Sequence, residues 1–152
     1  MGTGQPPPEY LILSSFLSLV MQNKITSSFC ELYGVLVGDG CISKYVTQNR
    51  LRYEIRIDGH ATTDLSYYQN TLIPLIHTIT NRSLKIRYRK DCKGIYLHMM
   101  NKELSTLLNN TYGFPYGKKN GSIRFPESLL HTTTHRRALL RGFFDTDARA
   151  YV

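Results

Sequence analysis

Two nine-residue stretches decide the fold of this chain: LYGVLVGDG at positions 32–40 and LRGFFDTDA at positions 140–148. Each is typical of an apolar helix that carries two small residues four positions apart and then an aspartate. The small residues are Gly34 and Gly38 in the first copy, and Gly142 and Thr146 in the second. Small residues at this spacing share one helix face and let two backbones approach closely. We therefore expect the two helices to pack together, with Asp39 and Asp147 side by side at one end.

Two carboxylates forced together repel each other unless a cation lies between them. Hard oxygen ligands favour Mg²⁺, and a divalent metal beside a phosphate can activate water and stabilise a leaving alkoxide, which is phosphodiester hydrolysis. The alternative is that each aspartate is part of a simple helix stop. Two matched copies on a basic chain favour the metal site over that alternative.

The charge balance indicates a polyanionic partner. The 152 residues include 19 Lys and Arg against 11 Asp and Glu, a net charge of +8, which suits nucleic acid first and an acidic membrane surface second. A hydrophobic fraction of 41% with 20% charged residues excludes disordered and collagen-like chains. Three cysteines without CxxC spacing give no disulfide framework and no zinc pair, so we expect an intracellular setting.

Residues 1–26 are interpreted as an N-terminal extension. Its apolar segment, YLILSSFLSLVM at 10–21, has about half of the ~20 residues that a membrane span requires, and three serines interrupt it. The segment follows a glutamate and a run of prolines rather than basic residues, which does not fit a secretory signal. We expect a short amphipathic helix packed on the domain.

The rest of the chain predicts an α+β fold with one antiparallel sheet and helices on one face. Thr26 to Ser28 offer N-cap residues for the first helix, with Glu31 as a capping acid. Asp64 to Thr80 indicates a second helix interrupted by Pro74, and Asn101 caps a third. The expected elements are a helix at 29–38, strands at 41–46 and 50–58, a helix at 64–80, strands at 84–89 and 95–99, a helix from 101 through 108, and a last helical segment from 126 to 145.

The long strands alternate strictly between apolar and charged residues. The apolar set, expected to face the helices, is Leu51, Tyr53, Ile55 and Ile57 in one strand and Leu84, Ile86 and Tyr88 in another. The opposite face is predicted to carry the nucleic-acid contacts Arg50, Arg52, Arg56, Lys85, Arg87 and Arg89. A basic β-ribbon of this kind fits the major groove of duplex DNA. The alternative is an ordinary solvated sheet face.

The two nonapeptides resemble the LAGLIDADG motif of the homing endonucleases, and the element order resembles that family's αββαββα half. The resemblance runs from about Ser27 to the end of the chain. It implies two motif helices at the centre of a saddle and cleavage of both DNA strands across the minor groove. It also implies two or three Mg²⁺ ions per active centre, with these ligands: the side chains of Asp39 and Asp147 and the main-chain carbonyls of Gly38 and Thr146.

The resemblance also suggests residues around the cleaved phosphate. The loop at 116–120 is similar to a lysine-bearing stretch of the family, so Lys119, or Lys118 beside it, is expected to stabilise transition-state charge; the alternative is two solvated lysines. His60 stands where relatives carry a glutamine, and it is either a water-ordering group or a surface histidine. Val37 and Ala148 depart from the family's motif.

Residues 27–125 are therefore interpreted as a first half, and 126–152 as a linker and the second motif helix. We expect a separate polypeptide to supply the rest of the second half; the alternative is a homodimer through the first motif. The predicted function is a site-specific, Mg²⁺-dependent double-strand DNA endonuclease of the intron-homing type, in a prokaryotic cytoplasm or an organelle. The alternatives are an RNA maturase on the same fold and a non-catalytic DNA-binding regulator, which would not need paired aspartates.

Overall fold

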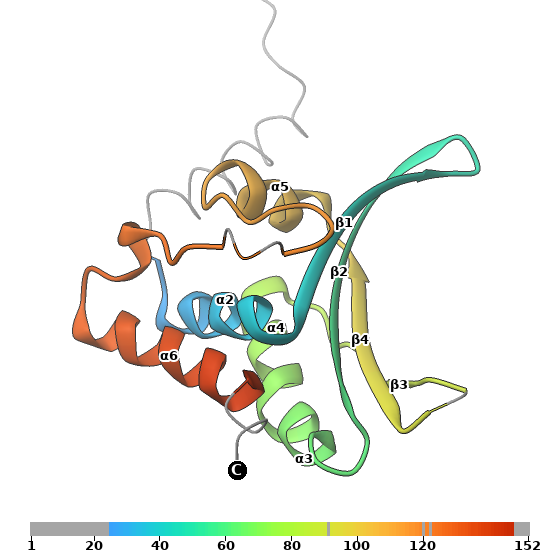
Figure 1. Ribbon diagram of the computed structural model, residues 1–152, viewed down its shortest axis with the longest axis horizontal. Helices are drawn as coiled ribbons and strands as arrows, with labels where there is room; N and C mark the ends of the chain where they lie inside the picture. Colours follow the sequence, from blue (N-terminus) through green and yellow to red (C-terminus); the bar gives the residue numbers. More distant parts are fainter. Residues whose placement is uncertain (1–24, 91, 120, 122, 148–152) are drawn as a thin grey trace, which may run out of the picture.

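The computed structural model describes residues 25–90, 92–119, 121 and 123–147, so the interpretation of residues 1–24 lies outside the described part (Figure 1). The elements are α2 (Ser27–Asp39), β1 (Gly40–Thr47), β2 (Arg50–His60), α3 (Leu65–Tyr67), the π-helix η1 (Tyr68–Leu72), α4 (Ile73–Thr80), β3 (Arg87–Tyr88), β4 (Gly94–Met100), α5 (Lys102–Asn110), the 3₁₀ helix η2 (Glu127–Leu129) and α6 (Thr133–Asp147). No described helix is both long enough and apolar enough to cross a bilayer.

The strands form one antiparallel sheet in the order β1-β2-β4-β3, and the helices cover one of its faces (Figure 1). The predicted α+β class is confirmed. Ile42 of β1 pairs with Ile55 of β2, and Ile57 of β2 pairs with Leu97 of β4. All four side chains are buried under the helices. Alternation along each strand therefore places the apolar residues in the core and the charged residues on the opposite face.

The prediction that Leu51 faces the core is wrong. Its side chain is 49% exposed, because the β1–β2 hairpin extends beyond the helices that cover the rest of the sheet (Figure 1). Tyr53, nearer the helices, is half-buried. Gln48 and Asn49 turn the hairpin with φ angles of 49° and 58°, the two positive values that a two-residue type I′ turn requires.

The strand predicted at 84–89 is also wrong in extent, since only Arg87 and Tyr88 join the sheet. These two residues form a short edge strand with a single neighbour, β4. Leu84 and Ile86 pack partly buried against the core without a ladder, and Tyr88 is 60% exposed rather than inward. A pattern of alternation indicates which face a residue prefers but not whether a neighbouring strand or helix covers it.

The helix predicted at 64–80 exists, but its middle is a π-helix. Pro74 has no N–H to donate to the carbonyl of Asn70, so the α-helical ladder is interrupted there. The amide of Ile73 instead bonds the carbonyl of Tyr68, five residues back, which widens the turn before α4 continues. Asn81 ends α4 in the left-handed conformation, with φ 57°.

Helix α2 forms the centre of the molecule, between the sheet and α6 (Figure 1). Its residues from Phe29 to Leu36 are all buried. The predicted N-cap is confirmed, since the hydroxyl of Thr26 accepts a hydrogen bond from the Phe29 amide at 3.1 Å. The same holds for Asn101, whose side chain accepts from the Leu104 amide at the start of α5.

Candidate functional site

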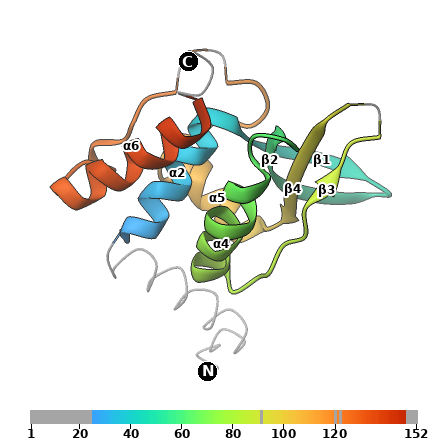
Figure 2. The same ribbon diagram turned by 90° about the horizontal axis from the view of Figure 1, so that it is seen from below.

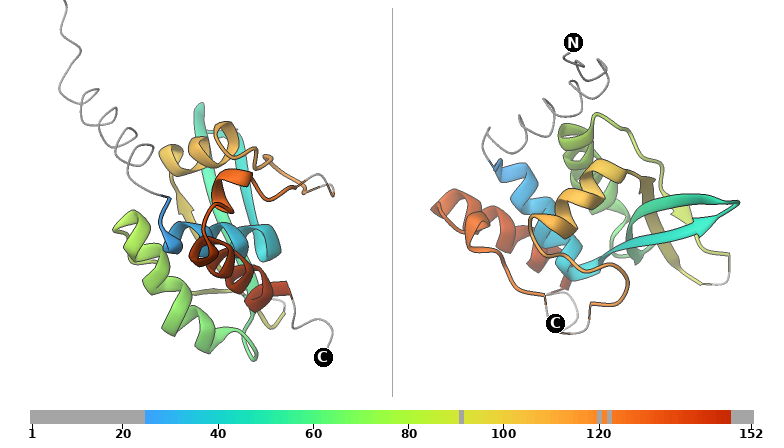
Figure 3. Two further views of the ribbon diagram at one scale, coloured as in Figure 1. Left: turned by 90° about the vertical axis from the view of Figure 1, so that its left-hand side faces the viewer. Right: turned by 90° about the horizontal axis from the view of Figure 1, so that it is seen from above.

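Helices α2 and α6 pack side by side through their glycines (Figures 2 and 3). A methyl carbon built on Gly34 would lie 2.1 Å from the carbonyl oxygen of Leu139 and 2.8 Å from the Phe143 amide nitrogen. One built on Gly142 would lie 2.9 Å from the carbonyl carbon of Glu31. Only glycine lets two backbones come this close. The predicted close packing of the two motif helices is therefore confirmed.

The two helices run parallel. Gly142 faces Glu31 and Val35 near the start of α2, whereas Gly38 near its end faces Thr146. Residue numbers thus increase together along the contact, and Asp39 and Asp147, the last residues of α2 and α6, end the helices on the same side of the molecule. The side chain of Asp147 lies outside the described residues. The hydroxyl of Thr146 bonds back to the carbonyl of Phe143 at 2.9 Å.

Lys119 places its ammonium group on the last turn of α2. Its Nζ donates to the carbonyl oxygens of Leu36, Val37 and Gly38 at 3.0, 2.8 and 2.9 Å. The last carbonyls of a helix lack intrahelical partners and carry the negative end of its dipole, so a cation there is stabilising. Lys118 is exposed instead. Of the two lysines that sequence analysis left open, Lys119 is the one that lies next to Asp39.

The loop that carries Lys119 is fixed to the sheet. Tyr116 forms a parallel bridge with Ile42 of β1, and the amide of Gly117 donates to the carbonyl of Ile42 at 2.8 Å. Cys41, next to Ile42, directs its thiol to the carbonyl of Gly117 at 3.6 Å. These contacts hold the loop beside the junction between α2 and β1. The position of Lys119 is thus set by β1 as well as by α2.

Tyr68 of η1 is a buried residue with a polar group, and the sequence does not single it out. It is 2% exposed, its hydroxyl lies against the backbone of Gly59, and no hydrogen-bond partner for that hydroxyl occurs within the described part of the chain. Burial raises the pKa of the Tyr68 phenol well above its ordinary value, and the carboxylates of Asp39, Asp64 and Asp58 raise it further. The phenol therefore stays protonated in the core. No pattern in the sequence signals this buried hydroxyl.

His60 is exposed at the end of β2 and takes part in the following turn. Its Nδ1 accepts a hydrogen bond from the Thr62 amide at 3.2 Å, and its own amide donates to Asp64 at 2.7 Å. These hydrogen bonds give His60 a structural role in the turn after β2.

Glu31 is not an N-terminal capping acid, as the sequence suggested. It is 7% exposed and lies 2.8 Å from the guanidinium of Arg141 on α6. The hydrogen bond and the charge of Glu31 raise the pKa of Arg141. The ion pair joins the two motif helices away from their aspartate ends, so Glu31 serves the contact between α2 and α6 rather than the helix terminus.

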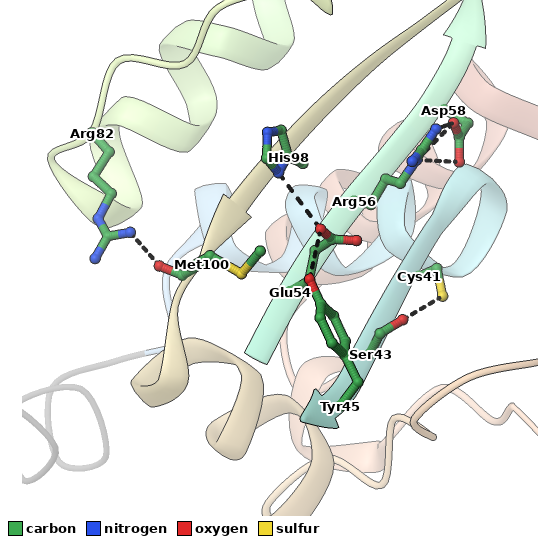
Figure 4. Close-up of polar contacts among 9 residues, drawn as sticks. All are labelled: Cys41, Ser43, Tyr45, Glu54, Arg56, Asp58, Arg82, His98 and Met100. Carbon is green, nitrogen blue, oxygen red and sulfur yellow. Dashed lines mark hydrogen bonds and ion pairs between the residues drawn. The ribbon is translucent and has the colours of Figure 1, made fainter. Parts of the chain in front are cut away.

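On the outer face of the sheet, Arg56 lies together with two acids, Glu54 and Asp58 (Figure 4). Asp58 forms ion pairs with Arg56 and with Arg89. Glu54 lies 3.6 Å from His98 and accepts from Tyr45 at 3.5 Å. Of the other predicted contact residues, Arg50, Arg52 and Arg87 lie on strands of the sheet, whereas Lys85 is exposed in the segment before β3. As the alternation in β2 predicts, Glu54 and Asp58 share the outer face with the arginines.

This arrangement of sheet and paired helices defines a homing-endonuclease half-domain fold. The homing endonuclease I-DmoI, as mesophilic variants, matches with a TM-score of 0.57 and 18% identity over 82% of this chain and 65% of that chain. I-DmoI in complex with DNA and Mn matches with a TM-score of 0.56 and 18% identity over 81% and 63%. A variant of I-DmoI in complex with its target DNA in the presence of Mg matches with a TM-score of 0.55 and 18% identity over 79% and 61%.

The resemblance to the LAGLIDADG homing endonucleases is thus confirmed for the fold. The chain spans about 60% to 65% of the length of these solved structures. No protein-family model and no curated protein matches the sequence.

Proposed function

We propose that this chain is the larger part of a site-specific, Mg²⁺-dependent DNA endonuclease of the intron-homing type, which hydrolyses both strands across the minor groove. The observation that supports the proposal most strongly is the parallel backbone contact of α2 and α6, which ends both helices in an aspartate on the same side. A structural protein would gain nothing from two motif helices that each end in an aspartate on the same side. The alternative of a DNA-binding regulator is disfavoured for the same reason.

The donor set fits a hard divalent cation. Proteins usually hold Mg²⁺ through one or two carboxylates, while water and substrate phosphates complete its coordination. Asp39 and Asp147 supply such a pair in the proposal, with the carbonyls of Gly38 and Thr146 as further ligands to two or three ions. Within the described residues no group of three His, Cys, Asp or Glu side chains could hold a metal alone. Bound Mg²⁺ would supply activated water and stabilise the leaving alkoxide.

The protein's own groups would position the DNA around these carboxylates. The ammonium of Lys119 is fixed on the last turn of α2, with its three N–H groups on backbone carbonyls, so it would act on a phosphate beside Asp39 through its charge. Because the same ammonium holds the Gly38 carbonyl, it also fixes the backbone that precedes Asp39. The basic outer face of the sheet would enter the major groove and contact phosphates and bases through Arg50, Arg52, Arg56, Lys85, Arg87 and Arg89.

The exposed side of α6 is proposed to be covered by a second half-domain. Helix α6 already occupies the glycine face of α2, so a homodimer through α2 would first have to displace it. Leu140 and Phe144, one turn apart on α6, are 43% and 53% exposed and would be covered by the missing sheet. Both observations favour a second half-domain against α6 over a homodimer through α2.

The test is cleavage of a plasmid that carries the intron-free insertion site. The full chain, alone and with any polypeptide that co-purifies from its host, is incubated with the plasmid and Mg²⁺. We expect a double-strand break at one site, no break with EDTA, and DNA binding without cleavage by Asp39→Asn. Asp145→Asn is the control, since it removes a carboxylate from the same turn of α6 as Asp147 without changing a proposed metal ligand, and it should leave cleavage unchanged.

Binding of intron RNA without DNA cleavage would support the maturase instead. Cleavage by Asp39→Asn at the wild-type rate would refute the proposed site.

A further inference from the structure

Asp58 lies at the centre of an ordered cluster on the outer face of the sheet (Figure 4). Its carboxylate accepts from Arg56 Nε at 3.0 and 3.3 Å and lies 3.0 Å from Arg56 Nη2. Arg89, which follows β3, reaches the same oxygen at 2.6 Å. The guanidinium of Arg56 also stacks over the ring of Tyr96 on β4, 4.1 Å from its centroid. Side chains from three neighbouring segments of the sheet thus meet around one carboxylate.

Stability does not explain this cluster. The side chains of Arg56, Asp58 and Arg89 are 31%, 41% and 46% exposed, and ion pairs at such exposure contribute little to folding. A carboxylate also weakens binding of the whole face to a polyanion by repulsion. Its presence at the middle of a basic face therefore calls for a compensating role, and the geometry of Arg56 supplies one.

The contacts of Arg56 leave one edge of its guanidinium for another ligand. Asp58 binds the edge formed by Nε and Nη2, so the edge formed by Nη1 and Nη2 is turned away from the carboxylate. That edge carries two parallel N–H groups, the arrangement that matches O6 and N7 of guanine in the major groove. Tyr96 fixes the plane of the Arg56 guanidinium, and Asp58 fixes its rotation within that plane. Arg56 therefore loses little side-chain entropy on binding a base.

We propose that Asp58 is a specificity-determining positioning residue that presents Arg56 to a guanine of the target DNA. The inference rests on the proposed function and deepens it, since it assigns one base and one reader. Arg50 and Arg87 are exposed on the same face, and they serve as general phosphate contacts. Asp58 never touches the base that it helps to select.

The experiment is selection of bound sequences from a randomised duplex DNA library by the full chain, compared with Asp58→Ala, Arg56→Lys and Glu54→Ala. Wild type should enrich a guanine at one position. Asp58→Ala should reduce that preference by about 5- to 150-fold, the discrimination of a bidentate contact, yet bind random DNA more tightly because a negative charge is lost. Arg56→Lys should lose the same guanine.

Glu54→Ala is the matched control, because it removes an equal charge from the same face without touching Arg56. It should tighten binding to random DNA and keep the guanine preference. Equal unfolding midpoints of the variants would exclude a folding defect. An unchanged preference in Asp58→Ala, or an equal loss of affinity for selected and random DNA, would overturn the inference alone. Absence of DNA binding by the wild type would overturn the proposed function together with it.

Discussion

The contact between α2 and α6 predicts that Gly34→Ala destabilises the protein, although alanine is the better helix former. A methyl group at this position would lie 2.1 Å from the Leu139 carbonyl oxygen, and real contacts of this kind are essentially never under 3.0 Å. The helices must therefore separate by roughly 1 Å. Both neighbouring atoms belong to the backbone of α6, so no rotamer change relieves the overlap.

The magnitude follows from two opposing effects. Overpacking a well-packed contact costs typically 1–3 kcal/mol, and this contact belongs at the upper end because only backbone can move. Replacing glycine by alanine within a helix returns about 1 kcal/mol. We expect a net loss of about 2 kcal/mol. For a chain of this length that loss lowers the unfolding midpoint by about 4–8 °C.

The assay is thermal and urea unfolding of the full chain, with Gly38→Ala as the informative comparison. An added methyl at Gly38 meets the Thr146 side chain, and its nearest backbone atom, the carbonyl oxygen of Phe143, is 3.7 Å away. Gly38→Ala should therefore be rescued by Thr146→Gly, with a favourable coupling energy in the double-mutant cycle. Gly34→Ala has no side chain whose removal would rescue it. A Gly34→Ala protein as stable as wild type, or more stable, would refute backbone contact between the helices.

Three further outcomes are expected. Lys119→Met should lower the free energy of unfolding by about 1–2 kcal/mol, because three carbonyls at the end of α2 lose a charged donor, whereas Lys118→Met should leave urea unfolding unchanged. Burial raises the pKa of the Cys30 thiol from 9.0 to about 11, so at neutral pH a thiol reagent should modify exposed Cys92 and spare Cys30 until the protein unfolds. Equal labelling of both thiols in the native protein would contradict the burial of Cys30. Because the folded state favours the neutral thiol, the contribution of Cys30 to stability is complete below pH 9 and is lost as the pH rises towards 11. Urea unfolding at alkaline pH would measure this loss.

Local sequence patterns predicted the parts of the fold in which the pattern of one element specifies what that element packs against. The glycine spacing of the two motifs predicted the α2–α6 contact, and alternation predicted which residues of β2 near Ile55 and Ile57 face the core. The pattern failed at Leu51 and Tyr88. Both occupy the positions that alternation assigns to the buried face, but their side chains are exposed because no other layer covers them. Coverage by another layer is a tertiary property, and the sequence of a single strand does not encode it.

The candidate site was predictable in its residue types but not in its contacts. Sequence analysis left Lys118 and Lys119 open, because loop lysines have no periodicity that assigns a direction. The alternation in β2 places Glu54 and Asp58 on the same face as the arginines, but it does not indicate their partners. Their partners, His98 and Arg89, come from segments far along the chain, so the pairing depends on strand order rather than on spacing within β2.

Helix α2 ends at Asp39 and strand β1 begins at Gly40, with no loop between them. In the proposed nuclease, the catalytic residue Asp39 and the β1–β2 hairpin that would bind the DNA are therefore consecutive in the chain. A mismatched base pair that tilts the ribbon would tilt the carboxylate with it, since no flexible joint absorbs the movement. Discrimination against a wrong site would then come from misplacement of the Asp39 carboxylate as well as from weaker binding. The protein could bind such a site without cleaving it.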